Sequence, residues 1–460
     1  MPPKFGTSGL RGLVVDLTDA LVADYVRAFL ATCDHGGSIW VGWDLRPSSP
    51  RIADAVVRAA AIEGVAVSIA GALPTPALAL AAADPRGSGG AVMVTGSHIP
   101  ADRNGLKFYT RAGEITKADE AAIMSGLGRA PAKGVASGAV SADAAAGARF
   151  IERYVAAFGC RALAGRQIGV YTHSAVGRDL LLAVLKGLGA ETVELARSEV
   201  FVPVDTEAVD AETRMLLGSW ADAYGLDAIV STDGDSDRPM MTDESGQVIA
   251  GDVLGQITAE LLGAEAVVTP ISSNSGVSQK PCFERVLRTR IGSPFVIAGM
   301  KESAGRVAGY EANGGFLLGF EAAGPAGPLT PLTTRDSFLP IIAPLVAAEG
   351  RPLSERIAAE PAVFTASDRL QDVSQEKMRV LVADMTCNSA TRSRLLAACG
   401  IEEVALDLTD GVRMSDANDH VLHVRPSGNA PELRVYVEAP DRESAVQILI
   451  QGLDTLQQML

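Results

Sequence analysis

Short runs of apolar, β-branched residues alternate with longer stretches of helical periodicity from the start of the chain. The pattern predicts strands over 39–43, 65–70 and 91–95, with an Ala- and Val-faced helix over 51–63 between the first two. Such alternation is typical of α/β domains with largely parallel sheets.

The alternation resumes after a stretch rich in Ala, Gly and Ser over 131–147, which we interpret as a domain junction. It predicts a second αβ unit and then a third, which begins near Asp243. The elements predicted in these two units are a helix over 178–188 and strands over 167–171, 192–195, 227–231, 266–270 and 295–298.

The pattern changes after about Pro361. Two strands, over 420–424 and 433–438, flank a Pro/Gly loop, and a helix is predicted over 443–460. We therefore expect a C-terminal part of a different kind. The total length of 460 residues is enough for three or four domains.

Charge and composition limit the partners. Lys and Arg number 40 against 55 Asp and Glu, a formal net charge of −15. Because nucleic-acid phosphates need a basic surface, we expect no nucleic-acid partner. The most apolar stretch, 65–83, is broken by glycine and proline and predicts no membrane span, and the N-terminus lacks the apolar core of a signal peptide. Five scattered cysteines without metal-binding spacing predict free thiols in the cytoplasm.

The first of four candidate chemical loops, 95–100, directly follows the predicted strand 91–95. Ligands gather at the carboxyl ends of strands in open parallel sheets, and Ser97 lies there between a glycine and His98. Its hydroxyl is a weak nucleophile that needs a base or a metal, and Lys107 lies close enough downstream to supply a positive charge. Considered alone, the loop is more simply an ordinary turn.

Three carboxylates at alternate positions, Asp233, Asp235 and Asp237, form the second loop. Hard oxygen donors in this spacing suit Mg²⁺ or Ca²⁺ rather than zinc. An EF-hand is excluded, because Arg238 occupies the position of its invariant glycine and a strand precedes the loop. A solvated acidic turn is the weaker interpretation, since three like charges packed so closely need a counter-ion.

The third and fourth loops carry groups that bind hydroxyls and anions. Glu311 and Asn313 lie on a glycine-flanked loop and are good hydroxyl binders. The fourth loop combines guanidinium, hydroxyl, amide and glycine backbone donors that together can bind a phosphate. These residues are Arg425, Ser427, Gly428, Asn429 and, on the following strand, Arg434. Either loop alone is also explained as a turn.

Taken together, the four loops resemble the α-D-phosphohexomutase family, which includes phosphomannomutase, phosphoglucomutase and phosphoglucosamine mutase. The segments 5–12 and 41–49 are similar to the family's first two signatures, and the four loops follow in the family's order, so the resemblance covers essentially the whole chain. It implies an α/β fold of four domains around a central cleft: three related αβ domains with mixed, largely parallel sheets, and a smaller C-terminal α+β domain. We place these domains at 1–140, 141–243, 244–360 and 361–460.

The chain departs from the family's pattern at several positions. In the serine loop, Gly96 and Ile99 replace the usual Ala and Asn, and in the metal loop Ser236 replaces Gly. In the sugar loop, Asn313 and Gly315 replace Ser and His, which leaves the sugar preference open and removes one possible acid/base histidine. The phosphate loop has Asn-Ala at 429–430 where Thr-Glu is common.

The resemblance also implies a mechanism. Ser97 would carry a phosphoryl group, and Asp233, Asp235 and Asp237, together with Ser97, would hold Mg²⁺. The serine would pass this group to a hexose monophosphate, and the resulting hexose bisphosphate would turn round and return its other phosphate. Reorientation requires a site that accepts either end of the sugar.

The remaining residues receive roles from the same resemblance. Lys107, His98 and Arg11 stay open as general acid or base, and Arg238 would offset negative charge on the transferred group. Ring hydroxyls would be held by Glu311 and Asn313. The non-reacting phosphate would be gripped by Arg425, Ser427, Gly428, Asn429 and Arg434.

Three alternatives compete with a phosphomannomutase that also accepts glucose phosphates. One is a phosphoglucosamine mutase, which usually has Asp in place of Ser8. Another is a metal-dependent phosphatase using the same serine, which would have no need to clamp a second phosphate. The last is a catalytically silent sugar-phosphate binder, which has no use for a serine beside a metal.

Overall fold

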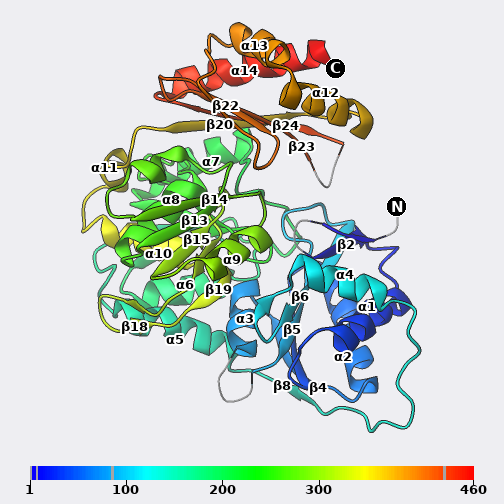
Figure 1. Ribbon diagram of the computed structural model, residues 1–460. Helices are drawn as coiled ribbons and strands as arrows, with labels where there is room; N and C mark the ends of the chain where they lie inside the picture. The colour runs from blue at the N-terminus through cyan, green and yellow to red at the C-terminus, as the bar shows by residue number, and fades with distance from the viewer. Residues whose placement is uncertain (1–2, 7–8, 84–87, 428–430) are drawn as a thin grey trace.

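The computed structural model describes residues 3–6, 9–83, 88–427 and 431–460 (Figure 1). Three αβ domains come first along the chain, and a smaller domain built on an antiparallel sheet follows (Figure 1). Within the described residues, no helix is both long and apolar enough to cross a bilayer. All five cysteines are free, as their spacing predicts.

The first domain is built on an eight-stranded mixed sheet in the order β1-β2-β6-β5-β3-β4-β8, with β7 added beside β6. Strands β5, β3, β4 and β8 are parallel, and β1, β2 and β6 run antiparallel. The elements are β1 (Lys4–Phe5), β2 (Leu10–Leu13), α1 (Asp19–Thr32), β3 (Ser38–Trp43), α2 (Ser49–Ile62), β4 (Ala66–Ala72), α3 (Thr75–Ala82), β5 (Gly90–Val94), β6 (Arg103–Thr110), β7 (Gly113–Glu114), α4 (Lys117–Ser125) and β8 (Val140–Ala142).

The second domain repeats the βαβ pattern on a smaller scale. Its four-stranded sheet has the order β10-β9-β11-β12, with only β12 antiparallel. The metal loop lies between β11 and β12, at the carboxyl end of β11. The elements are α5 (Ala146–Phe158), β9 (Gln167–Tyr171), α6 (Arg178–Gly187), β10 (Glu191–Leu195), α7 (Ala211–Tyr224), β11 (Ala228–Thr232) and β12 (Pro239–Met241).

The third domain has a five-stranded sheet in the order β14-β13-β15-β16-β19, parallel in its first three strands. Its core is continuous with that of the second domain and with α3 of the first. The elements are α8 (Gly251–Leu261), β13 (Ala266–Pro270), η1 (Ser275–Gln279), β14 (Arg285–Thr289), α9 (Ser293–Glu302), β15 (Val307–Tyr310), β16 (Phe316–Leu318), β17 (Ala322–Ala323), β18 (Pro328–Leu329), β19 (Leu332–Asp336), α10 (Leu339–Ala347) and α11 (Leu353–Ala358).

The fourth domain has its own hydrophobic core and an antiparallel sheet in the order β20-β24-β23-β22-β21. The β23–β24 hairpin points from this domain toward the rest of the molecule (Figure 1). The elements are β20 (Phe364–Leu370), α12 (Gln375–Cys387), α13 (Ser389–Ala398), β21 (Ala405–Asp407), β22 (Val412–Ser415), β23 (Val421–Pro426), β24 (Leu433–Ala439) and α14 (Arg442–Met459).

Most predicted elements are confirmed to within one or two residues, and so is the fold class of three mixed αβ sheets with a smaller C-terminal α+β domain. The strand predicted over 295–298 is wrong, because these residues lie inside α9 (Ser293–Glu302). A short apolar run fits a buried helix as well as a strand. The signal for a helix was present: Pro294 stands in its first turn, where a missing N–H costs nothing.

Candidate active site

The serine loop is held in a conformation that exposes its hydroxyl to a neighbouring domain. It follows β5, and Ser97 has φ of 53°, a left-handed conformation that few non-glycine residues adopt. The backbone N–H of Ser97 donates to Thr95 Oγ1 at 2.8 Å, which supports this conformation. The side chain is buried, with 1% of its surface exposed.

A fully buried arginine fixes the backbone around this serine. Arg46 donates from Nε to Asp44 Oδ2, from Nη1 to two carbonyls (of Pro100 and Arg103), and from Nη2 to the carbonyls of Ser97 and Ile99. All five N–H groups of the guanidinium are therefore used. The side chain lies directly against Gly96, where an added Cβ would be 2.6 Å from Arg46 Cζ. Glycine at this position, where the family usually has alanine, makes room for the arginine.

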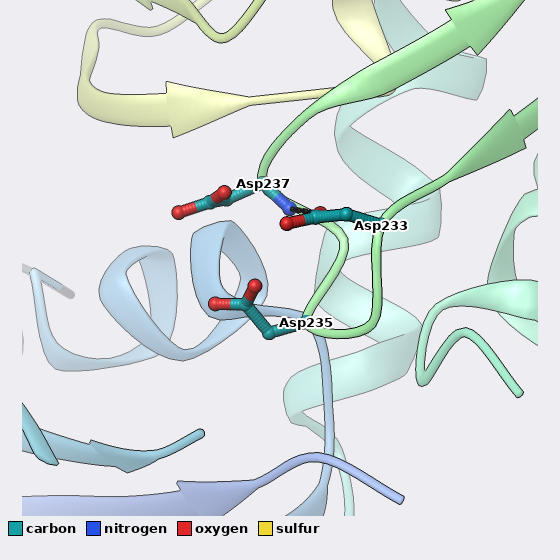
Figure 2. Close-up of side chains that lie close together, drawn as sticks. All are labelled: Asp233, Asp235 and Asp237. Carbon is teal, nitrogen blue, oxygen red and sulfur yellow. Dashed lines mark hydrogen bonds between the residues drawn. The ribbon is translucent and has the colours of Figure 1, made fainter. Parts of the chain in front are cut away.

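The metal loop presents its three carboxylates toward a common region (Figure 2). Asp233, Asp235 and Asp237 are all buried, and one oxygen of each lies within 4.8 Å of the others. Asp233 Oδ1 accepts the backbone N–H groups of Asp237 and Arg238, at 3.1 and 3.2 Å, which closes the loop. The alternate spacing seen in the sequence thus brings the carboxylates together.

Ser236 shows how the loop tolerates its departure from the family's glycine. Its φ is 57°, the left-handed conformation for which glycine is usual. Its hydroxyl accepts the N–H of Gly177 at 2.9 Å and shares a hydrogen bond with Thr232 Oγ1 at 2.8 Å. These contacts offset the strain of the backbone, and the carboxylates keep their positions.

The serine loop and the metal loop meet directly. Ser97 Oγ donates to Asp233 Oδ2 at 2.5 Å, although the two residues belong to different domains. Lys107, on β6 beside the serine strand, donates to Asp235 Oδ2 and to Asp237 Oδ2, each at 2.5 Å. The predicted meeting of the hydroxyl, the lysine and the carboxylate trio is thus present in the structure.

The donor set fits a hard divalent cation. Among the described residues, Asp235 Oδ1 and Asp237 Oδ1 are buried oxygens without a hydrogen-bond partner. Burial and the neighbouring charges of Asp235 and Asp237 raise the pKa of Asp233 well above its ordinary value. A cation among these oxygens would remove that penalty. Asp233, Asp235 and Asp237 can therefore hold a metal, with Ser97 Oγ beside them.

Positive side chains surround the trio and define the protonation of His98. Arg238 Nη1 lies 3.0 Å from His98 Nδ1, and since a guanidinium only donates, Nδ1 must accept and the ring proton is assigned to Nε2. Burial and the charge of Arg238 lower the pKa of His98 to about 3, so the imidazole is neutral. Burial and the charges of Arg238 and Arg335 lower the pKa of Arg11 to about 10.

The sugar loop lies against the metal loop, since an added Cβ at Gly315 would be 3.1 Å from the carbonyl of Asp237. Glu311 is buried, and its Oε2 accepts from Arg335 Nη1 at 3.1 Å. Asn313 Oδ1 accepts the N–H of Gly315 at 3.0 Å, so this oxygen stabilises its own loop. From the sequence, both the oxygen and the N–H groups of Asn313 are candidates to bind ring hydroxyls. In the structure the oxygen is already used within the loop.

Two arginines flank the C-terminal phosphate loop. Arg425 and Arg434 are directly opposite each other on β23 and β24, and the Nε of each is buried without a hydrogen-bond partner in the described structure. Arg425 Nε lies 3.4 Å from Asp410 Oδ1 in an ion pair. Ser427 is buried at the end of the strand, whereas Gly428 and Asn429 lie outside the described residues.

Glu207, in the second domain, is close enough to Arg238 of the metal loop and to Arg434 of the fourth domain for both positive charges to act on its carboxylate.

Four residues of this arrangement are not predicted from the sequence. Arg46 and Asp44 lie in the segment 41–49, whose similarity to a family signature does not indicate their contacts. Thr75 donates to Asp235 Oδ2 at 2.6 Å, and Arg335 bridges Asp237 and Glu311. For Arg335 the one signal is the Arg-Asp-Ser sequence at the end of a short strand, which carries little information on its own.

Comparison with known proteins identifies the domains. Four family models of the phosphoglucomutase/phosphomannomutase group match in order: alpha/beta/alpha domain I over 2–131, domain II over 148–246, domain III over 242–364 and the C-terminal domain over 359–450. Together they cover nearly the whole chain.

Full-length relatives agree. The chain is 44% identical to a phosphomannomutase of Sinorhizobium fredii, over 99% of both chains, and 42% identical to one of Salmonella muenchen, over 99% of this chain and 96% of the other. Its fold is similar to that of a putative phosphomannomutase from Thermus thermophilus, with a TM-score of 0.78, 22% identity and 99% of both chains covered. It is also similar to an Aspergillus fumigatus N-acetylphosphoglucosamine mutase solved with GlcNAc-6P and magnesium, with a TM-score of 0.60, 14% identity and 100% and 96% of the two chains covered. The chain belongs to the phosphoglucomutase/phosphomannomutase family, as the order of its motifs predicts.

Proposed function

We propose that the protein is a phosphomannomutase, which moves a phosphoryl group between the 6- and 1-positions of mannose phosphate and accepts glucose phosphates as well. The observation that carries this proposal is the 2.5 Å hydrogen bond between Ser97 Oγ and Asp233 Oδ2. It joins a buried nucleophile to a metal-binding loop, and the full-length relatives with 42 and 44% identity are phosphomannomutases. A cytoplasmic location fits the five free cysteines.

Ser97 would carry the phosphoryl group in the resting enzyme. In the forward step the bond between Ser97 Oγ and phosphorus breaks and a bond from phosphorus to the sugar hydroxyl oxygen forms. The hydroxyl proton passes to a base, and the leaving Ser97 Oγ takes up a proton from an acid. The reverse step, on the other phosphate of the bisphosphate, restores the phosphoserine. Positions of the charges around Ser97 matter more than covalent chemistry in such transfers.

The protein groups around the serine divide this work. Asp233, Asp235 and Asp237 would hold Mg²⁺, which when bound neutralises charge on a phosphoryl oxygen. Lys107 lies between two of these carboxylates. The low pKa of His98 makes it a weak proton acceptor, which leaves Lys107 and Arg11 as the better candidates for proton transfer.

Substrate would be held from two sides. The guanidinium groups of Arg425 and Arg434, opposite each other on β23 and β24, are suited to the non-reacting phosphate. Glu311 would accept hydrogen bonds from ring hydroxyls, and Asn313 would contribute only its amide N–H groups, since its oxygen is used within the loop. Enclosure between the domains would exclude water, because hydrolysis competes with transfer.

Two measurements test the covalent scheme. Ser97→Ala should lose mutase turnover and stable labelling by radioactive phosphate from the bisphosphate, whereas the exposed control Ser125→Ala should keep both. Exhaustive chelation should abolish turnover, and Mg²⁺ should restore it. Full activity of Ser97→Ala, or turnover indifferent to chelation, would exclude the scheme.

Substrate identity is tested with mannose, glucose and glucosamine phosphates, each supplied with its bisphosphate. We expect the highest kcat/KM with mannose 1-phosphate. Preference for glucosamine phosphate would instead identify a phosphoglucosamine mutase. Release of inorganic phosphate without exchange of label between the two sugar positions would identify a phosphatase.

A further inference from the structure

Arg335 connects the loop that would bind the sugar to the loop that would bind the metal. It lies near the end of β19 and is 3% exposed. Its Nε and Nη2 both donate to Asp237 Oδ2, at 3.1 and 2.6 Å, while Nη1 donates to Glu311 Oε2 at 3.1 Å. One rigid guanidinium therefore contacts both carboxylates at once.

Gly315 leaves the space that this arginine occupies. A Cβ built there would lie 2.8 Å from Arg335 Cδ, 2.9 Å from Cγ and 3.1 Å from the carbonyl of Asp237. The backbone of Gly315 has no positive φ, so its conformation does not require glycine. The absence of a side chain at Gly315 therefore serves the placement of Arg335.

The strand that carries Arg335 is anchored on both sides. Asp336 Oδ2 accepts from Tyr154 of α5 at 2.6 Å, and Asp336 Oδ1 accepts the N–H of Phe338 at 2.9 Å. Ser337 donates to the carbonyl of Ser236 in the metal loop at 2.7 Å. These contacts limit movement of the backbone at 335, so the guanidinium can change partners only by small movements of its own.

Two cationic side chains share the carboxylate of Asp237. Lys107 donates to its Oδ2 at 2.5 Å and Arg335 donates to the same oxygen at 2.6 Å. A divalent cation on Asp237 would weaken the attraction of this carboxylate for Arg335. The arginine would then interact more strongly with Glu311, its second acceptor.

We propose that Arg335 is a positioning residue that couples metal binding at Asp237 to the orientation of Glu311, so that Mg²⁺ and hexose phosphate bind cooperatively. The inference rests on the proposed function. By linkage, each ligand must raise the affinity for the other by the same factor. Gly315 belongs to the same device, because it determines where the arginine side chain lies.

The test is calorimetric titration of the unphosphorylated enzyme with Mg²⁺, in the absence and in the presence of saturating mannose 1-phosphate. Free mannose 1-phosphate also binds Mg²⁺, so this affinity is measured separately and the titration is corrected for it. For the wild type we expect the sugar phosphate to tighten Mg²⁺ binding about 10-fold, within the usual range of coupling between sites. In Arg335→Met the factor should fall below about twofold, and Arg335→Lys should recover part of it.

Two further variants separate coupling from folding. Gly315→Ala keeps every charge and presses mainly on the arginine side chain, so it should lower the coupling factor at least about threefold. The matched control is Arg392→Met, which removes a buried arginine that pairs with Glu403 in the fourth domain. It should reduce stability and leave the coupling unchanged.

The outcomes are distinct. Wild-type protein that binds Mg²⁺ but no sugar phosphate would refute the proposed function, and this inference with it. Wild-type binding of both ligands without cooperativity would overturn the inference alone. Full coupling in both Gly315→Ala and Arg335→Lys would also overturn the inference, even if Arg335→Met failed to fold. An equal loss of coupling in Arg392→Met would overturn it as well.

Discussion

Gly96→Ala restores the residue that is usual in the family and should nevertheless damage this protein. The added methyl group would lie 2.6 Å from Arg46 Cζ and 2.8 Å from Nε, distances that real Cβ contacts do not reach. Arg46 cannot simply move away, because all five of its N–H groups donate to Asp44 or to loop carbonyls. Either the guanidinium or the serine loop must shift.

The magnitude follows from the contacts that would be lost. Overpacking of a filled interior costs about 1–3 kcal/mol, and each buried group left without its hydrogen bond about 1–3 kcal/mol. Loss of one of the hydrogen bonds of Arg46, together with residual strain, gives a loss in free energy of unfolding of about 2–5 kcal/mol. A displacement of Ser97 by 1 Å from Asp233 would lower kcat about 100-fold.

The assay combines thermal unfolding with coupled mutase turnover. A loss of 3 kcal/mol should lower the melting temperature of the first domain by about 6–12 °C. The control is Gly218→Ala on α7, where the nearest atom to an added Cβ is 4.0 Å away and a gain of about 0.5–1 kcal/mol is expected. Wild-type melting and turnover in Gly96→Ala would refute the reasoning, since they would require that Arg46 can yield at no cost.

Three further outcomes are expected. Ser236→Gly relieves a left-handed backbone conformation that costs about 1–2 kcal/mol. It also removes two hydrogen bonds of the hydroxyl and leaves the buried N–H of Gly177 unpaired, so the variant should be less stable by about 1 kcal/mol in urea unfolding. Greater stability would contradict this. Lys107→Met leaves two buried carboxylates without their shared cation, so the rise in melting temperature on adding Mg²⁺ should be larger than in the wild type, and an equal rise would show that the lysine does not balance the trio. Burial lowers the pKa of His173 from 6.5 to about 4. As the pH falls, the unfolded chain therefore binds a proton at this histidine before the folded protein does. The stability due to the neutral imidazole is complete above pH 6.5 and is lost between pH 6.5 and about 4. His173→Gln should reduce the slope of unfolding free energy against pH in that window by about 1.4 kcal/mol per pH unit, followed by the fluorescence of Trp220 in the same domain, and an unchanged slope would exclude this histidine as the cause.

The sequence was informative where chemistry and local periodicity coincide. The serine and the aspartate trio each follow a run of buried β-branched residues, so their place at strand ends could be inferred from the pattern. The apolar stretch 295–298 has no such periodicity and was misassigned. The chemical loops could be grouped only because their order matched a known family.

The groups that hold these loops in place could not be found in this way. Arg46 and Arg335 act through contacts with residues far along the chain: Arg46 with the loop at 97–103, and Arg335 with Asp237, which precedes it by almost a hundred positions. Pairing at such separations follows from the packing of domains and leaves no local pattern. The domain boundaries at 140, 243 and 360 remain predictions.

The distribution of this site over three domains has a consequence for synthesis of the chain. The carboxylate trio is complete once residue 237 has been made, but Arg335 is translated almost a hundred residues later. Until then a nascent chain carries closely packed negative charges that Arg335 does not yet help to offset. A divalent cation would be the natural temporary partner, so depletion of such ions during translation should slow the maturation of the second domain more than that of the first.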